Sequence, residues 1–257
     1  MRAVLTVLGS GTSMGVPTIG CQCRVCSSTD PRDHRTRPSI MLEYDARCVL
    51  IDTTPDFRQQ AIRESIRRLD AIVYTHAHAD HILGLDDIRP LSFKNAERIP
   101  LYAHQPTAHA VQHIFSYIFD EESEYGARAR VQMHHIEGTI ELFGAQFEPI
   151  RIIHGSAEIH GYRFGSAAYL TDFSEIPPES MERLRGLDIL FLDALRHRPH
   201  PTHSTVANSL RLVEELQPRR AFFTHICHDL PHEETNRSLP EHVRLAHDGL
   251  KLEFDIA

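Results

Sequence analysis

The strongest chemical signal in the sequence is a short run of metal-ligating side chains, Thr75-His76-Ala77-His78-Ala79-Asp80-His81. The run follows the apolar segment Ala71–Tyr74, so we expect it to begin where a strand ends and its side chains to converge on one point. Imidazole and carboxylate groups together bind zinc, iron or manganese, and a pair of such ions can activate water for hydrolysis. A merely polar loop is the alternative interpretation, because the chain has 19 histidines.

The pattern His-x-His-x-Asp-His at a strand end resembles the signature of metallo-β-lactamase superfamily hydrolases. In that superfamily a distant His, a bridging Asp and a last His complete the site, each after its own strand. His154, Asp172 and His225 match these three positions in order, and each directly follows an apolar segment. The resemblance also assigns Asp52, which ends the segment Cys48–Ile51, to the Asp that orients a ligand from behind.

This resemblance implies a complete set of ligands for two divalent ions, manganese or zinc. The set is His76, His78 and His154 on one ion, Asp80, His81 and His225 on the other, and Asp172 between them. A carboxylate shared by two ions holds them roughly 3.5–4 Å apart, which is the spacing used in two-metal hydrolysis. We expect a hydroxide held between the ions to attack the substrate, with Asp80 counted among the catalytic residues.

A second group of ligands is the cysteine triplet Cys21, Cys23 and Cys26. Three thiols within six residues need one more ligand to close a tetrahedral zinc site, and His228 is the candidate, with Cys227 as the local rival. We expect this zinc to be structural and to attach the N-terminal loop, residues 9–38, to the segment that carries His225. Loss of the structural zinc should therefore also disturb the catalytic metals.

Together, the Gly-rich start, the cysteine triplet, the metal motifs and Thr224-His225-Ile226-Cys227-His228-Asp229 narrow the resemblance. The chain is similar to the phosphoribosyl cyclic phosphate phosphodiesterases of the carbon–phosphorus lyase pathway and to their uncharacterised relatives. The resemblance implies a metal-dependent phosphodiesterase that cleaves a small cyclic or nucleotide-like phosphodiester. It also suggests a homodimer.

The loop between Asp193 and Thr205 contains candidates for a proton donor. Histidine is the side chain best suited to donate a proton near pH 7, and His203 is our first choice, with His200 second. His203-Ser204-Thr205 resembles the histidine-containing loop of tRNA 3′-end endonucleases. Three further residues, Arg196, Thr12 and Ser13, are candidate substrate contacts.

Strand-like and helix-like segments alternate in two similar halves, which predicts an α/β fold, a four-layer αββα sandwich. We expect this to be one domain, residues 1–257. The expected strands are Ala3–Leu8, Ile40–Tyr44, Cys48–Asp52, Ala71–Thr75, Pro100–Ala103, Gln146–Ile153, Gly161–Phe164, Ala167–Thr171, Asp188–Leu192, Arg220–Thr224 and Leu250–Ile256. The expected helices are Arg58–Arg68, Ile82–Leu91, Thr107–Ile118, Glu179–Arg185 and Thr205–Leu216, and the acidic segment Asp120–Gly126 is expected to be a surface excursion.

Composition limits the possible partners. A formal charge of −8 disfavours long DNA or RNA, because nucleic-acid binding depends mainly on Lys and Arg. No apolar run has the length of a membrane-spanning helix, and no signal sequence is evident, so we expect a cytoplasmic protein that binds no membrane.

Two alternatives to a phosphodiesterase remain open. One is a thioester or lactone hydrolase with the same metals, although the short tail after Asp229 leaves little room for the helical substrate region of such enzymes. The other is a non-enzymatic binding module stabilised by metal. All the implied ligand positions are filled, which favours an enzyme.

Overall fold

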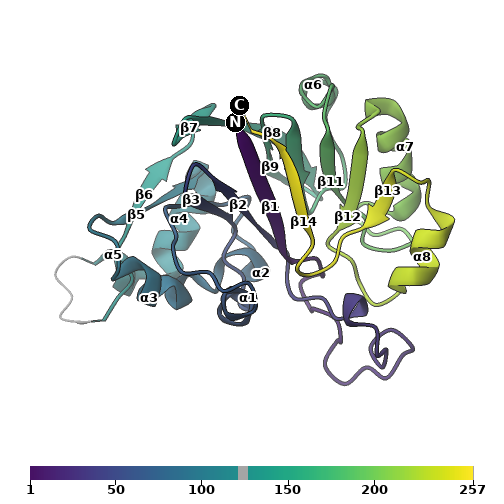
Figure 1. The fold of residues 1–257 in the computed structure, drawn as a ribbon, viewed down its shortest axis with the longest axis horizontal. Coiled ribbons are helices and arrows are strands. Elements are labelled where there is room, and N and C mark those ends of the chain that lie inside the picture. Colours follow the sequence, from purple (N-terminus) through teal and green to yellow (C-terminus); the bar gives the residue numbers. More distant parts are fainter. Residues whose placement is uncertain (121–126, 257) are drawn as a thin grey trace.

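The computed structural model describes residues 1–120 and 127–256. The first of two sheets in these residues has seven strands. The spatial order of this first sheet is β14-β1-β2-β3-β4-β5-β6, with β3 to β6 parallel and the other neighbours antiparallel (Figure 1). The bounds are β1 Arg2–Gly9, β2 Ser39–Tyr44, β3 Arg47–Ile51, β4 Ala71–Val73, β5 Ile99–Ala103, β6 Val131–His135 and β14 Lys251–Asp255.

The second sheet also has seven strands among the described residues, in the order β13-β12-β11-β10-β9-β8-β7. Here β10 to β13 are parallel, and β7 to β10 are antiparallel. The bounds are β7 Ile140–Leu142, β8 Ala145–His154, β9 Ala157–Phe164, β10 Ala167–Leu170, β11 Ile189–Asp193, β12 Arg220–Thr224 and β13 Val243–Leu245.

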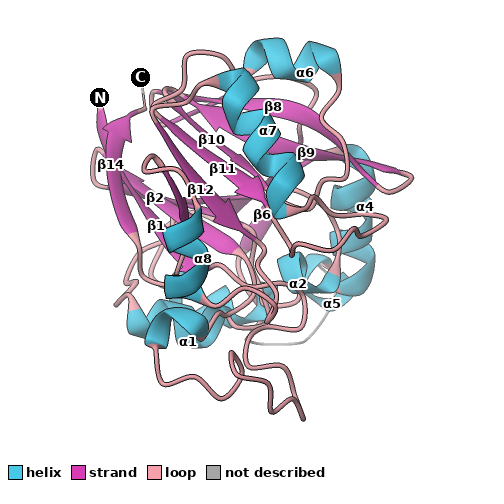
Figure 2. Cartoon of the chain, turned by 90° about the vertical axis from the view of Figure 1, so that its right-hand side faces the viewer, coloured by secondary structure: helices cyan, strands magenta, loops and turns pink. Residues whose placement is uncertain are grey.

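Helices cover the outer side of each sheet, and Figure 2 shows α6 and α7 against the second one. The helical bounds are α1 Phe57–Arg63, α2 Ala79–Ile82, α3 Arg89–Ser92, α4 Gln105–Ile114, α5 Ser116–Phe119, α6 Pro178–Arg183, α7 Val206–Leu216 and α8 His232–Ser238, with 3-10 turns at Pro31–Asp33 and Leu85–Ile88. No helix in the described residues is long and apolar enough to span a bilayer.

Three apolar clusters hold the layers together. Val49 and Phe191 belong to the cluster between the two sheets, while the next residue on β3, Leu50, packs against α1 to α5. Leu190 likewise faces α6 and α7. Successive strand residues point to opposite faces, so a strand covered on both sides must be apolar throughout. The αββα sandwich expected from the sequence is therefore confirmed.

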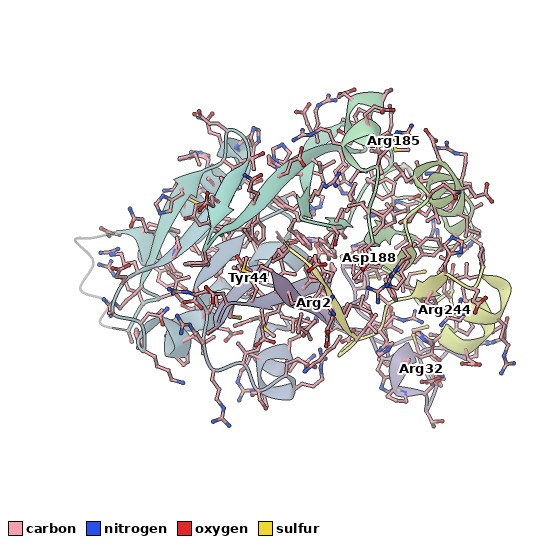
Figure 3. The ribbon with its side chains drawn as sticks, turned by 45° about the horizontal axis from the view of Figure 1, so that its top comes forward. Arg2, Arg32, Tyr44, Arg185, Asp188 and Arg244 are labelled. Carbon is pink, nitrogen blue, oxygen red and sulfur yellow. The ribbon has the colours of Figure 1, made fainter. Side chains whose placement is uncertain are left out.

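A polar bond also crosses the inner layer. The Tyr44 hydroxyl on β2, labelled in Figure 3, donates to the carbonyl oxygen of Leu142 on β7 at 2.8 Å. Both groups are buried, so this hydrogen bond fixes how the edge strand β7 of the second sheet packs against β2 of the first.

All the expected strands are present, but several helices differ from expectation. The helix expected to extend to Arg68 ends at Arg63, because Ser65 adopts a left-handed backbone with φ of 56°. The segment after the metal motif is α2, a 3-10 turn and α3 in place of one helix, and a break at Phe115 separates α4 from α5. The expected acidic excursion lies outside the described residues except for Asp120.

Four elements were not predicted: β6, β7, β13 and α8. Two of the strands, β7 and β13, have only three residues each, too short to show a period. The sequence of β6, Val-Gln-Met-His-His, has no clear apolar alternation, and α8 is almost entirely polar.

The topology brings the ends of several strands to one edge. Strands β3 and β4 are parallel, and β8, β10, β11 and β12 also run in one direction because β9 lies antiparallel between β8 and β10. Residues that follow the carboxyl ends of these strands therefore gather at the same end of the sandwich, where we expect the functional site.

Candidate metal centre

Three site residues lie just after a strand and have a left-handed backbone: Asp52 and His225 are the first residue after β3 and β12, and Asp172 is the second after β10. The φ angles are 66° at Asp52, 59° at Asp172 and 57° at His225. This conformation is unfavourable for most side chains, although Asp, Asn and His tolerate it better than others. It turns the chain sharply, so the side chain points across the end of the sheet.

The motif Thr75–His81 begins in the turn after β4 and continues into α2, which carries Asp80 and His81. Its return path passes very close to the loop after β3, where the Gly84 amide donates to the Thr53 carbonyl at 2.9 Å. A Cβ on Gly84 would lie 1.9 Å from the Thr54 carbonyl oxygen, so only glycine fits here. This contact holds the ligand-bearing turn against β3.

The seven ligands implied by the resemblance converge in two overlapping groups. The groups are His76, His78, His154 and Asp172, and Asp80, His81, Asp172 and His225, each with its ligand atoms within 4.8 Å of one another. We call the seven residues the histidine–aspartate cluster. Asp172 belongs to both groups, with Oδ2 at 3.9 Å from His76 Nε2 and Oδ1 at 3.3 Å from His81 Nε2.

Hydrogen bonds behind the cluster fix the orientation of two imidazoles. His81 Nδ1 donates to Asp52 Oδ2 at 2.7 Å, and His154 Nδ1 donates to the Thr202 carbonyl at 2.8 Å. In both rings Nε2 is left free to face the cluster, which is the arrangement of a metal-binding histidine. The orienting role expected for Asp52 agrees with this contact.

The cluster has two parts with different electrostatics, one formed by His76 and His154 and the other by His225 and its neighbouring carboxylates. Burial lowers the pKa values of His76 and His154, so these imidazoles are neutral near pH 7. For His225, burial opposes protonation, but Asp172 and Asp80 more than offset it and raise the pKa to about 9. The carboxylate side of the cluster therefore attracts positive charge, and the imidazole side offers neutral lone pairs.

Unpaired buried atoms test whether these residues fit metal ions. His76 Nε2, Asp80 Oδ2, His81 Nε2 and both ring nitrogens of His225 are buried without a hydrogen-bond partner. A buried polar atom without a partner is costly, yet here several of them face one another. Divalent ions between them would satisfy these atoms, so the residues present fit the metal centre.

The predicted proton donor His203 lies beside this cluster. Its ring stacks on His225 with centroids 4.6 Å apart and a 12° interplanar angle, and His154 packs edge-on at 4.8 Å. His203 Nδ1 donates to Asp193 Oδ2 at 2.7 Å. Sequence reasoning missed Asp193, although it ends β11 as Asp52 follows β3, and this shared position was the available signal.

Four other residues were predicted to donate a proton or to contact the substrate: His200, Arg196, Thr12 and Ser13. His200 lies next to His203, with ring centroids 5.0 Å apart. The Arg196 guanidinium donates to the carbonyls of Arg198 and Pro199, and so it braces its own loop. Thr12 is buried with its amide on the Ile226 carbonyl, one residue from His225, whereas Ser13 is exposed.

The cysteine triplet lies around a histidine, as the sequence suggested. Nδ1 of His228 is 3.3 Å from the Sγ atoms of Cys21 and Cys26 and 3.7 Å from that of Cys23. These four residues, the cysteine cluster, have their ligand atoms within 4.8 Å of one another. The rival Cys227 is outside the cluster, since its buried thiol accepts from the Asp229 amide.

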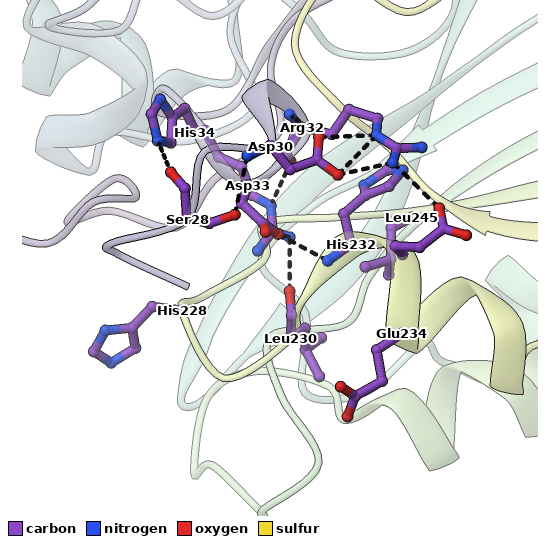
Figure 4. A network of polar contacts seen from close by, with 12 residues as sticks. Ser28, Asp30, Arg32, Asp33, His34, His228, Leu230, His232, Glu234 and Leu245 are labelled. Atoms are coloured by element: carbon purple, nitrogen blue, oxygen red, sulfur yellow. Dashed lines mark hydrogen bonds and ion pairs between the residues drawn. The ribbon is translucent and has the colours of Figure 1, made fainter. Parts of the chain in front are cut away.

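A buried arginine attaches the N-terminal loop to the segment that carries both clusters. Arg35 is only 1% exposed and donates to the carbonyls of Cys227 (2.9 Å) and Leu230 (2.7 Å). Asp33 neutralises it at 3.2 Å and also accepts from the His232 amide, in the polar network of Figure 4. Arg35 thus connects the N-terminal loop, which carries the three cysteines, to the segment that carries His225 and His228.

Comparisons with known proteins agree with this site. The beta-lactamase superfamily domain matches residues 47–226, a segment that contains the whole histidine–aspartate cluster but not the cysteine triplet. A crystal structure of a diphosphatase from the PhnP family is 65% identical, with a TM-score of 0.95, and the match covers 100% of this chain and 98% of that one.

More distant proteins share the fold. Zn²⁺-bound PqqB from Methylobacterium extorquens is 21% identical, covering 97% of this chain and 99% of that one, with a TM-score of 0.79. The short form of human tRNase Z is 16% identical over 99% of each chain, with a TM-score of 0.69.

One curated relative is much longer than this chain. The octanoyltransferase of Porphyromonas gingivalis (strain ATCC BAA-308 / W83) is 37% identical over 260 residues, which is 99% of this chain but only 52% of the octanoyltransferase.

From the domain match and the diphosphatase, we conclude that the chain is a metal-binding member of the metallo-β-lactamase superfamily of hydrolases and belongs to its PhnP family.

Proposed function

We propose that the protein hydrolyses a phosphorus–oxygen bond in a small molecule, and that its substrate is a cyclic or nucleotide-like phosphodiester. The observation that carries this proposal is the position of His203, hydrogen-bonded to Asp193 and stacked against His225. A metal cluster with a proton donor at its side is suited to expel a poor leaving group.

Two divalent ions, manganese or zinc, would be held by the histidine–aspartate cluster in the two groups described above. When bound, such ions supply an activated water and neutralise charge on the phosphoryl oxygens. The chain's contribution is the fixed geometry of the ligands, since Asp52, Thr202 and the left-handed residues restrict how the rings can turn.

His203 would give a proton to the departing oxygen. Its Nδ1–H is held by Asp193, so Nε2 is the atom available to the leaving group. Asp193 is fully buried and would stabilise the ring when it carries a second proton. His200, whose ring centroid lies 5.0 Å from that of His203, is the second candidate.

The choice between a diester and a diphosphate follows from the leaving group. A sugar alkoxide is a poor leaving group and needs a proton as it departs, whereas a phosphate leaves as a stable anion. The His203–Asp193 pair therefore favours a phosphodiester. A diphosphate is the second candidate, because the relative at 65% identity is described as a diphosphatase.

Acyl transfer is not proposed. The octanoyltransferase is about twice as long as the segment it shares with this chain, so its named activity has no necessary connection to the shared half. A thioesterase would use the same ligands but would not need a proton donor, because a thiolate leaves readily.

Hydrolysis of bis(p-nitrophenyl) phosphate tests the proposed site. We expect the manganese- or zinc-loaded protein to release p-nitrophenol and His76→Ala to lose at least about 10²-fold in turnover, with the far-UV circular dichroism spectrum unchanged. Unchanged turnover in a metal-checked His76→Ala protein would refute the site.

A leaving-group comparison tests the role of His203. His203→Ala should lose about 10²–10⁴-fold against a 2′,3′-cyclic nucleotide, the range expected for one general acid. The loss should be much smaller against bis(p-nitrophenyl) phosphate, because p-nitrophenolate leaves readily. Equal losses on both substrates would exclude proton donation by His203, and wild-type preference for inorganic diphosphate over both would favour the second candidate.

A further inference from the structure

A pocket outside the histidine–aspartate cluster lies at the same end of the sandwich. Its volume is about 410 Å³, and it is lined chiefly by His104, Gln105, His135, Glu137, Pro149 and His160. We call it the side pocket. Pockets that bind small molecules start at roughly 300 Å³, so this one has room for a single heterocyclic ring and part of its neighbour.

The strand order explains why the side pocket lies near the predicted metal ligands. Strands β4, β5 and β6 are parallel neighbours, and their carboxyl ends lead to His76, His104 and Glu137 in turn. The Tyr74 amide donates to the Tyr102 carbonyl at 2.8 Å, which holds the first two of these ends together. The side pocket thus begins one strand away from a ligand.

A second connection comes from the other sheet. The His160 amide on β9 donates to the Thr75 carbonyl at 3.3 Å, and the Thr75 hydroxyl lies 3.0 Å from His76 Nδ1. His160 is therefore two contacts away from the histidine–aspartate cluster. A ligand in the side pocket would be close enough for a group attached to it to reach the cluster.

The lining indicates what kind of group would bind. His104 and His160 pack edge to face with ring centroids 4.7 Å apart, and together they form an aromatic wall. Burial lowers the pKa of His160 to about 4, so its ring is neutral near pH 7, and its Nδ1 has no hydrogen-bond partner. Gln105 and Glu137 add an amide and a carboxylate at the rim.

No Lys or Arg lines the side pocket among the described residues. A phosphate would therefore find no cation there, and Glu137 would repel it. A neutral planar ring with N–H donors, such as a nucleobase, would stack on the imidazoles and donate hydrogen bonds to the Glu137 carboxylate and the Gln105 amide oxygen.

We propose that the side pocket binds the nucleobase of a nucleotide-like substrate, on the ester group that remains attached to phosphorus. This inference rests on the proposed function. His203 contacts His154 and His225, and the leaving group must face it. The side pocket is instead connected to the cluster through His160 and Thr75, away from His203, which leaves it for the group that does not depart.

Two esters with the same leaving group provide the test. Thymidine 5′-(p-nitrophenyl phosphate) and methyl p-nitrophenyl phosphate both release p-nitrophenolate, and only the first has a base. In the double variant His104→Ala/Glu137→Ala, we expect kcat/KM for the thymidine ester to fall about tenfold, mainly through KM, as for the loss of one good contact. The methyl ester should be hydrolysed within about twofold of wild type.

The matched control is His109→Ala/Glu141→Ala, whose two exposed side chains lie outside the side pocket. It should behave as wild type with both esters. As an independent measurement, saturation-transfer NMR with free thymidine should show binding to wild type and to the control, and a weaker signal with the double variant.

The outcomes separate two kinds of failure. If wild type hydrolyses both esters and the double variant keeps the wild-type ratio of kcat/KM and the thymidine signal, the side pocket is not a base site. If wild type hydrolyses neither ester with metals bound, the proposed function fails and this inference fails with it.

Discussion

The two metal-ligand clusters of this protein are built in opposite ways. Most residues of the histidine–aspartate cluster follow strands of two packed sheets, whereas three of the four residues of the cysteine cluster belong to a loop with one short 3-10 turn. Strands position their ligands before any ion arrives. The apolar cluster of the loop itself, around Val16, Val25 and the cysteines, is small, so we expect the shape of the loop to depend on a bound ion as well as on Arg35.

This difference predicts that one cluster controls activity and the other controls stability. A preorganised site loses function when a ligand is removed but keeps its fold, because the strands remain packed. A loop closed by metal loses its fold locally, because metal binding and folding are coupled there. The variants below separate these effects.

The largest expected effect is on turnover. Asp172→Asn removes the carboxylate shared by the two groups, and we expect turnover of bis(p-nitrophenyl) phosphate to fall on the order of 10³-fold or more. Elemental analysis should show loss of active-site metal with one zinc retained. A melting temperature lowered by as much as in a cysteine variant would contradict the comparison.

The second effect is on stability. Cys26→Ala should lose one zinc per chain and lower the melting temperature by roughly 10 °C, since loss of a structural metal can cost over about 4 kcal/mol and each 1 kcal/mol shifts a chain of this size by about 2–4 °C. Cys227→Ala is the control, because this buried thiol is outside the cysteine cluster. Equal zinc loss in both variants would reopen the choice between Cys227 and His228.

The third effect concerns the arginine that joins the loop to the ligand segment. Arg35→Met leaves the Asp33 carboxylate buried without its partner, which should cost about 3–5 kcal/mol in chemical denaturation. Both clusters should bind metal more weakly, with partial rescue in Arg35→Lys. Arg32→Met, on the same loop but 40% exposed, should cost less than about 1 kcal/mol. Unchanged metal content in Arg35→Met would mean that the arginine stabilises the loop alone.

The smallest effect is a pH dependence beside the cysteine cluster. Burial, with Arg32 and Arg35 nearby, lowers the pKa of His232 to about 4, whereas an unfolded histidine titrates near 6.5. Between these values the unfolded chain binds more protons, so stability is lost as the pH falls from about 6.5 to 4, by less than about 1.4 kcal/mol per pH unit. His232→Gln should flatten the slope of urea stability against pH, and the exposed His242→Gln should not.

The difference between ligands that follow strands and ligands on a loop also explains which site residues could be predicted from the sequence. His154, Asp172 and His225 were identified through the resemblance to the superfamily, which expects its ligands after strands, and each of the three follows an apolar segment. Asp193 follows the same rule but was passed over, because a carboxylate that acts only through a histidine on another loop has no local pattern. The choice of His228 over Cys227 depended on which side chain turns inward, and the spacing of residues does not reveal this.

Other features depend on tertiary contacts and were not predictable. Arg35 reads as an ordinary charged loop residue, yet the carbonyls of Cys227 and Leu230 draw it into the interior. The side pocket combines residues from the start of α4 with residues in or just after β6, β8 and β9, which no segment of sequence brings together. Strands as short as β7 and β13 form only because a longer neighbour offers them partners.

His225 and His228 are three residues apart and belong to different clusters, and this short stretch acts as a fixed spacer between the two centres. The Ile226 amide in this stretch donates to the Ser10 carbonyl, and the Ile226 carbonyl accepts from the Thr12 amide. Inserting one residue between His225 and His228 would displace at least one of these histidines from its cluster. That cluster would then lose a ligand. Between these two histidines, the length of the chain is thus fixed by the two centres that it serves at once.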